Sequence, residues 1–219
     1  MDNLKLENRK IIDVCDLFVT FKSDVENLFS IIKIDNTSPK IERLSIFSIP
    51  QEVRQIDPNL KYQPTYKLTF EGKDTSIFLG DDIIGFNLSK NKADETNIDF
   101  IFKILELIEE EIQSVARIGI KRIFNNESIN NQLSLKINNI DKTKNFSQIK
   151  LKEDNCLTTI TNAENHQVVI DDNRKTNGYL IEIITFYDNL EIIKHNTIKE
   201  NINNLYVLQE KKYNEIIGE

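Results

Sequence analysis

The amino-acid sequence predicts an α+β fold, in which antiparallel sheets combine with short N-terminal, central and C-terminal helices. Two observations lead to this prediction. Three short β-type segments between residues 66 and 88 are separated by turns of only a few residues, which favours antiparallel pairing. Helical periodicity appears before and after groups of such segments, without a regular strand–helix alternation. The order of elements predicts two sheet-and-helix halves in one compact unit, residues 1–125 and 132–219, with one continuous domain as the alternative.

The composition is that of a globular protein with an acidic surface. The chain has 219 residues, of which 39% are hydrophobic and 29% charged, enough for a core of ordinary size. It carries 28 Lys+Arg against 35 Asp+Glu, a net charge of -7, which is the wrong sign for attraction to nucleic acid or anionic lipid. We therefore expect no membrane partner, and no nucleic-acid partner unless a local basic patch provides a binding site.

The N-terminus and the two cysteines predict a cytoplasmic protein with reduced thiols. The segment from Met1 to Lys5 lacks the basic start and apolar core of a signal peptide, and no apolar run approaches the roughly 18 residues of a membrane span. Cys15 and Cys156 lie far apart without a CxxC pattern, so neither a disulfide framework nor a structural zinc site is expected.

The first third of the chain predicts a strand, a short helix and an irregular excursion. Lys10–Phe21 is rich in β-branched and aromatic residues, which is typical of a well-buried strand. Ser23 and Glu26 have the spacing of a capping box and predict a helix that ends at residues 36–39. Residues 41–49 indicate another strand, and the prolines that follow confine regular structure to short pieces.

A three-stranded meander and a central helix follow. Residues 66–70, 76–79 and 83–88 are the three strands, with turns at residues 71–74 and 80–82. The central helix is predicted to begin near Thr96, supported by Asp99, and to extend through an apolar stripe to Ile112.

Residues 117–124 form the next predicted strand and contain the best site candidate. Alternation places Ile118 and Ile120 on one face and Arg117, Gly119 and Lys121 on the other. Arg117, Lys121 and Arg122 are the densest basic group in this acidic chain and suit a phosphate or carboxylate clamp. The alternative is pairing inside the protein, with acids such as Glu109, Glu110, Glu111, Asp81 or Asp82.

The second half repeats strands and then a helix. Residues 132–137, 146–151 and 157–161 are strand candidates, and residues 167–170 and 180–187 flank a turn at residues 171–178 in a long hairpin. A last helix is predicted from Thr197, with Glu200 as its capping partner, through Tyr213 to about Gly218.

The strand at residues 117–124 resembles the R-I-G-L-R-Y-x-N segment of a sporadically distributed prokaryotic family of uncharacterised proteins. Lys10–Phe21 is similar to that family's opening strand without its prolines, residues 76–87 resemble its central hairpin, and residues 186–217 resemble its closing strand and helix. The sequence departs from the family at Arg122 and Phe124, where Tyr and Asn are usual, and it has no Trp before the central helix. The resemblance implies a fold and a class, and no mechanism.

Other chemistry-bearing residues have two interpretations each. Asp81–Asp82 and Asp171–Asp172 would supply oxygen ligands for Mg²⁺ if the fold brought them together, and otherwise are turn residues. His166 and His195 are predicted surface residues, and Cys15 a small buried hydrophobe. Because the sequence has no G-x-S-x-G, P-loop or G-x-G-x-x-G motif, we expect no cofactor.

These observations favour a non-catalytic cytosolic accessory, regulatory or immunity-like protein that binds a macromolecular partner, most simply another protein. Hairpin edges can accept a partner strand, and pairing of such edges between copies of the chain would give a homo-oligomer. The alternative function is an enzyme or a nucleotide or phosphate sensor that uses the basic strand and nearby carboxylates.

Overall fold

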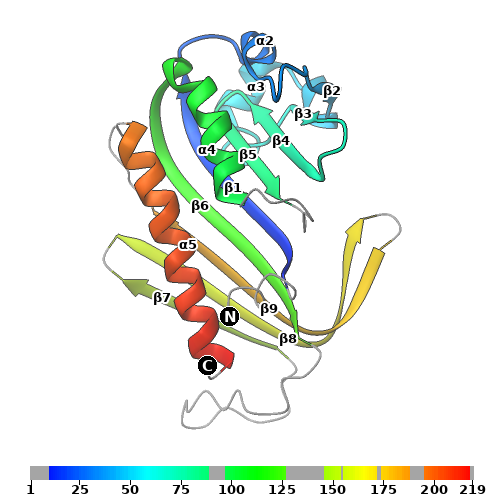
Figure 1. Cartoon of the computed structure of the whole chain (residues 1–219), viewed down its shortest axis with the longest axis vertical. Helices are drawn as coiled ribbons and strands as arrows, with labels where there is room; N and C mark the ends of the chain where they lie inside the picture. The colour runs from blue at the N-terminus through cyan, green and yellow to red at the C-terminus, as the bar shows by residue number, and fades with distance from the viewer. Residues whose placement is uncertain are drawn as a thin grey trace.

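The computed structural model describes residues 10–88, 97–126, 146–153, 155–171, 174–187 and 195–217. Within these residues nine strands form one antiparallel sheet with the order β2-β3-β4-β5-β1-β6-β9-β8-β7 (Figure 1). The strands are β1 (Lys10–Phe21), β2 (Lys40–Arg43), β3 (Tyr66–Thr69), β4 (Thr75–Gly80), β5 (Ile83–Leu88), β6 (Ile112–Asn126), β7 (Phe146–Glu153), β8 (Cys156–Asp171) and β9 (Arg174–Tyr187). Strands β1 and β6 therefore lie in the middle of the sheet.

Four α-helices accompany the sheet in the described part of the chain: α2 (Leu28–Ile31), α3 (Gln51–Ile56), α4 (Asn97–Leu107) and α5 (His195–Ile217). Three 3-10 turns, η1 (Val25–Asn27), η2 (Ser45–Ser48) and η3 (Glu109–Glu111), lie between them and the strands. Figure 1 shows α4 and α5 over the same face of the sheet, with α2 and α3 at its upper end. None of the described helices is long and apolar enough to cross a membrane.

The α+β fold is confirmed, whereas the prediction of two sheet-and-helix halves is wrong. Strand β6 pairs with β9 from Ile118↔Tyr187 to Asn126↔Tyr179, so strands from both halves of the sequence join one sheet. The reason is that β1 pairs with only one edge of β6. The other edge of β6 pairs with β9, a strand from the second half of the sequence. The division into domains at residues 1–125 and 132–219 stays a prediction, because residues 127–145 lie outside the described part.

The predicted meander is confirmed, since β3, β4 and β5 pair consecutively and antiparallel. The long hairpin is also confirmed but its turn is tighter than predicted, because β9 already begins at Arg174 and Asp171 pairs with it. Residues 157–161 and 167–170 belong to the single strand β8. The strand predicted at residues 132–137 lies outside the described residues.

Several helix boundaries differ from the prediction because side chains have long-range partners. The Ser23 hydroxyl donates to a Glu111 carboxylate oxygen 2.7 Å away, and Glu26 accepts the Tyr66 hydroxyl at 2.5 Å, so neither serves a capping box. The helix there is a 3-10 turn followed by one α-helical turn. The central helix, which was predicted to extend to Ile112, ends at Leu107, and Ile112 is the first residue of β6.

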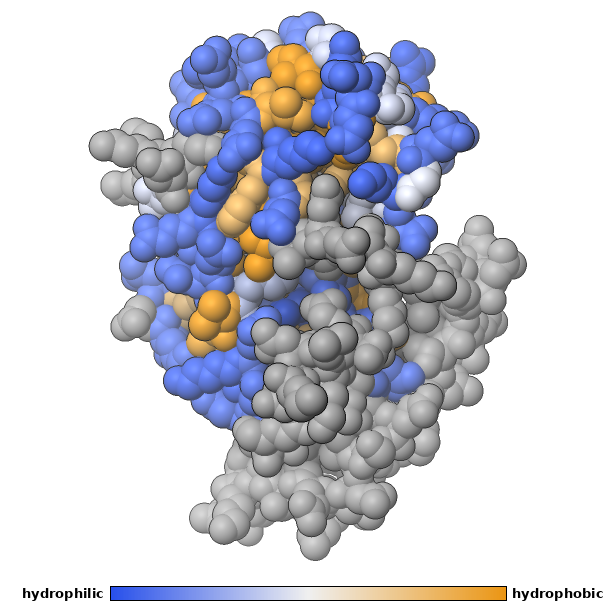
Figure 2. Space-filling model, in the orientation of Figure 1, coloured by the Kyte–Doolittle hydropathy of each residue, from blue (hydrophilic) through white to orange (hydrophobic). Residues whose placement is uncertain are grey.

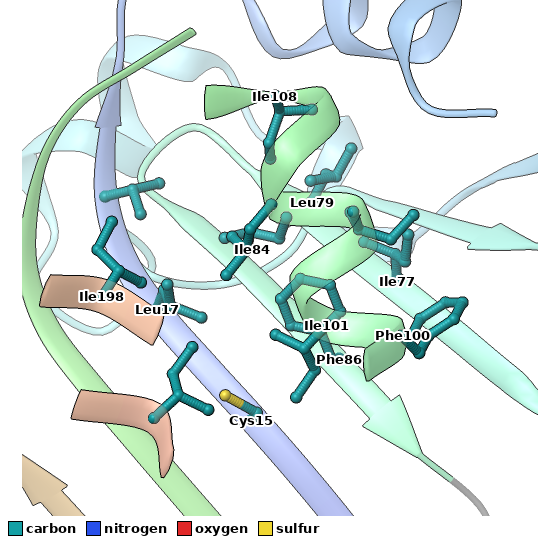
Figure 3. Packing of buried hydrophobic residues seen from close by; sticks show 14 of the residues in the cluster. Cys15, Leu17, Ile77, Leu79, Ile84, Phe86, Phe100, Ile101, Ile108 and Ile198 are labelled. Atoms are coloured by element: carbon teal, nitrogen blue, oxygen red, sulfur yellow. The ribbon is translucent and has the colours of Figure 1, made fainter. Parts of the chain in front are cut away.

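The main core lies between the sheet and the two long helices. Figure 3 shows Ile101 of α4, Ile108 just after this helix and Ile198 of α5 directed toward Leu17, Ile84 and other buried strand residues. Each such side chain contributes roughly 1.5–3 kcal/mol when buried. Cys15 has no exposed surface and burial raises the pKa of its thiol, so the prediction of a small buried hydrophobe is confirmed.

Figure 2 shows the side of the molecule that carries α4 and α5. Its outer surface is mostly hydrophilic, with hydrophobic patches near α2 and over α5. Among the exposed hydrophobic residues of α5 is Val207, which is 65% exposed.

Candidate functional site

The predicted basic group is divided between the two faces of the sheet. Ile118 and Ile120 of β6 belong to the core under α4 and α5, so Arg122, which shares their face, points toward α5. Arg117 and Lys121 point to the opposite face. We call this opposite face, formed by β3, β4, β5, β1, β6, β9 and β8 away from α4 and α5, the second face. The three residues therefore do not form one clamp.

Arg122 is held inside the protein and is only 1% exposed. Its Nε donates to the Gln209 amide oxygen at 2.7 Å, and its Nη2 donates to the Tyr206 carbonyl at 3.0 Å. The amide nitrogen of Gln209 in turn donates to the carbonyls of Ile120 and Ile183, at 2.7 and 3.2 Å. Arg122 and Gln209 thus join α5 to β6 and β9, which is a structural role.

A second buried polar group joins α5 to β1. The Tyr206 hydroxyl donates to an Asp13 carboxylate oxygen at 2.9 Å, and the Lys10 ammonium lies 3.0 Å from the other oxygen of Asp13. Both Lys10 and Asp13 are buried. Burial, with Asp13 as the nearest acidic neighbour, raises the pKa of Tyr206 well above its usual value, so the hydroxyl keeps its proton and remains a donor.

On the second face, the two basic residues lie among aromatic and acidic side chains. The Lys121 ammonium is 2.7 Å from a Glu182 carboxylate oxygen. The Arg117 guanidinium lies over the Phe186 ring at 3.9 Å and near the Phe18 ring at 5.5 Å. Phe18 stacks in turn on Tyr62, with ring centroids 4.1 Å apart. These aromatic side chains are half-buried, so the second face presents rings and a guanidinium together.

One cross-strand row on the second face contains an acid that the sequence analysis did not single out. Asp16 of β1 lies between Gly85 of β5 and Gly119 of β6, and the phenylalanines of β4 and β9 come next on either side. We call this row the Asp16 row; it consists, in sheet order, of Lys67, Phe78, Gly85, Asp16, Gly119, Phe186 and Leu157. Backbone without side chains therefore lies on both sides of the Asp16 carboxylate.

The Asp16 carboxylate is in an unusual electrostatic position. Burial raises its pKa from 3.8 to about 6, and the nearby Lys121 ammonium only partly opposes this rise. Among the described residues, no donor lies within hydrogen-bond distance of its oxygens. A Cβ at Gly85 would lie 2.5 Å from Asp16 Oδ1, whereas a Cβ at Gly119 would meet only Phe186 and Thr185, at 3.5 and 4.0 Å. The glycine at position 85 is needed to accommodate this carboxylate.

A sequence signal for the Asp16 row exists, although its pairing is not visible in one dimension. Gly85 and Gly119 are isolated glycines inside strongly apolar strand patterns, which indicates close approach of another group to the backbone. Asp16 is an acid inside an equally apolar strand. Only the register of β5, β1 and β6 places the three residues side by side.

The remaining predicted candidates are not brought together in the described part. Asp81 binds Arg54 through both carboxylate oxygens, at 2.9 and 3.0 Å. Asp172 and the side chains of Asp171, His166 and His195 lie outside the described residues. Over the described ranges, no group of three or more His, Cys, Asp or Glu side chains is arranged to hold a metal ion.

Comparison of the chain with protein-family models, curated proteins and solved structures gives no match. The resemblance of residues 117–124 to a prokaryotic family therefore stays a prediction, and the function has to be inferred from the geometry of the chain itself.

Proposed function

We propose that this chain is a non-catalytic binding protein, of the accessory, regulatory or immunity kind, whose second face contacts a protein partner. The observation that carries the proposal is the Asp16 row. It combines a half-buried carboxylate without a hydrogen-bond donor among the described residues, bare backbone beside it, and aromatic rings with a stacked arginine around it.

The extent of this surface favours a protein over a small ligand. The Asp16 row crosses seven strands, which at the usual strand spacing is about 29 Å. A surface of this width is comparable to one side of a standard protein interface, about 800 Å² per partner. Small-molecule sites are concave instead and enclose most of their ligand.

The side chains on this surface are those that dominate binding energy in protein interfaces. Aromatic residues and arginine are enriched at interface centres, where truncation costs about 2 kcal/mol or more. Arg117 is held over Phe186 and Phe18, so little side-chain entropy is lost when a partner covers it. A partner that donates a hydrogen bond to Asp16 would supply the donor that this carboxylate lacks within the described residues.

The alternative, a phosphate or nucleotide sensor, would require the basic residues to act together. Lys121 would have to leave Glu182, and Arg122 lies on the other side of the sheet. The geometry thus supports partner binding better than phosphate binding.

The proposal is tested by affinity capture of the tagged full chain from its host, with two variants compared to the natural chain. Gly119→Leu fills the space beside Asp16 where the neighbouring atoms leave room for a Cβ. Val207→Ala alters an exposed residue of α5 on the opposite side and is the control. We expect one protein in stoichiometric amount with the natural chain and the control, and its loss with Gly119→Leu. Equal recovery with both variants, or a melting temperature raised by millimolar nucleotide and no captured protein, would refute the proposal.

A further inference from the structure

A second feature of the molecule, independent of the second face, is a large polar cavity at the end that carries α2 and α3. Four separate parts of the chain surround it: residues 20–27, which include the end of β1, helix α3, Tyr66 of β3 and the β4–β5 turn. Figure 1 shows these elements together at the upper end of the sheet. The cavity volume is about 810 Å³, which is in the range of small-molecule sites. It contains no residue of the Asp16 row.

Hydrogen bonds between distant parts of the sequence fix the cavity wall. Arg54 of α3 is only 7% exposed, and besides its two bonds to Asp81 its Nη1 donates to the Ile49 carbonyl at 2.5 Å. The backbone N–H of Lys22 donates to the carbonyl of Glu111 at 2.8 Å. Because these contacts already order the wall, a ligand would bind without paying for that ordering.

The charge of the wall is negative and unevenly compensated. Arg54 and Asp81 neutralise each other, and the other charged residues of the wall are one cation, Lys22, and three acids, Asp24, Glu26 and Asp82. The wall therefore has a net charge of -2. Within the described residues no donor lies in hydrogen-bond distance of the Asp82 carboxylate, which is half-buried, and burial raises its pKa while Lys61 opposes the rise.

The rest of the wall offers neutral polar groups and some apolar surface. Amide and hydroxyl side chains come from α3 and from residues 20–27, and the half-buried Phe21 adds apolar area, whereas Val25 and Tyr66 line the wall but are almost completely buried. In the described part of the chain, the acids do not form a cluster suited to a metal ion. This combination fits an organic cation with several N–H donors separated by methylene groups.

We propose that the cavity binds an aliphatic polyamine, with an ammonium group at Asp82 and the methylene chain along Phe21. Carboxylates attract the ammonium groups through charge-assisted hydrogen bonds, and the amides of Gln51 and Gln55 accept further N–H donors. The cavity is large enough for a linear amine of the length of spermidine together with water.

Calorimetric titration and thermal melting of the full chain with spermidine test this proposal. Saturable binding and a higher melting temperature are expected, whereas 1,8-octanediol, which has a methylene chain and no charge, should have no effect. Asp82→Asn should weaken spermidine binding about tenfold or more. Glu71→Gln, which removes the same charge from an exposed turn outside the cavity, should weaken it less than about twofold.

A second pair of variants keeps the test decisive if Asp82→Asn is poorly folded. Gln51→Lys adds a cation to the cavity wall, and Val53→Lys adds one two residues away on the same helix, at a 49% exposed position outside the wall. Only Gln51→Lys should abolish spermidine binding. The proposal is wrong if spermidine does not bind saturably. It is also wrong if a folded Asp82→Asn weakens spermidine binding no more than Glu71→Gln does, or if Gln51→Lys weakens it no more than Val53→Lys does.

Discussion

Lys121 and Arg122 are neighbours in the sequence and lie on opposite faces of the same strand, with opposite roles. Lys121 is half-buried on the second face and forms an ion pair with Glu182. Arg122 is almost completely buried and is bound by Gln209 and the Tyr206 carbonyl of α5. The comparison shows that a basic residue in a strand can lie on a partly exposed face or can hold a helix to the sheet, and that the two-residue period of the strand decides which.

The largest expected effect is on the assembly side. Arg122→Ala leaves Gln209 and a backbone carbonyl without their donor in the core and creates a void, so the free energy of unfolding should fall by about 3 kcal/mol. Lys121→Ala removes a partly exposed ion pair and should cost about 0.5 kcal/mol. Urea denaturation of both variants measures the difference; equal losses would contradict the division of roles.

On the second face, the buried acid predicts a pH dependence of stability. Burial raises the pKa of Asp16 from its ordinary value of 3.8 to about 6, so the folded state holds this proton more tightly than the unfolded chain does. The resulting stabilisation is fully present below about pH 4 and is lost as the pH rises through about 6. Asp16→Asn should therefore stabilise the protein by about 3 kcal/mol at about pH 7.5 and by less than about 1 kcal/mol at about pH 4.

Denaturation of the natural chain and Asp16→Asn at both pH values measures this effect. The charged groups that face Asp16 include Lys121, so the same comparison in a Lys121→Met background should enlarge the difference at the higher pH. A constant difference across the pH range would show that Asp16 has an ordinary pKa.

A smaller effect is expected at the contact between α5 and β1. Tyr206→Phe removes the hydroxyl that donates to Asp13 and leaves this buried carboxylate with one partner fewer, which should cost about 1.5 kcal/mol. Thermal or urea unfolding at neutral pH measures it. A change below about 0.3 kcal/mol would mean that Asp13 does not depend on the Tyr206 hydroxyl.

The smallest effect distinguishes the two glycines beside Asp16. Gly119→Ala makes only ordinary contacts and should change stability by less than about 0.5 kcal/mol. Gly85→Ala forces the Asp16 oxygen to move and should destabilise by about 1 kcal/mol. Unfolding experiments, with the Asp16 pKa followed by NMR, check the pair; identical behaviour of the two variants would mean that the carboxylate does not depend on Gly85.

Sequence patterns predicted the local elements well because strands and helices of this chain keep their hydrophobic periods. The meander and the alternation around Ile118 and Ile120 are confirmed in the structure. The prediction of a capping box at Ser23 is wrong because Ser23 and Glu26 have hydrogen-bond partners 88 and 40 residues away, and no local sequence pattern indicates such partners.

The candidate site was less predictable, because it depends on strand register. A basic triplet is visible in the sequence, but the burial of Arg122 depends on Tyr206 and Gln209 of α5, which lie more than 80 residues later. Asp16 was hidden in an apolar strand, and its two flanking glycines come from strands about 70 and 100 residues away. The single sheet was missed because pairing of β6 with β9 leaves no signal in either strand alone.

The central position of β1 has a consequence for synthesis on the ribosome. About 90 residues separate the end of β1 from the start of β6, so at about 5–20 residues per second β1 waits roughly 5–20 s before that neighbour emerges. Strand β5, the neighbour on the other edge, is made first, but the edge of β1 that pairs with β6 stays open for the whole interval, and an open apolar strand edge is a condition under which nascent chains aggregate or bind chaperones. Strand β1 can be covered fully only after α5 is made, since Tyr206 binds Asp13 across 193 positions.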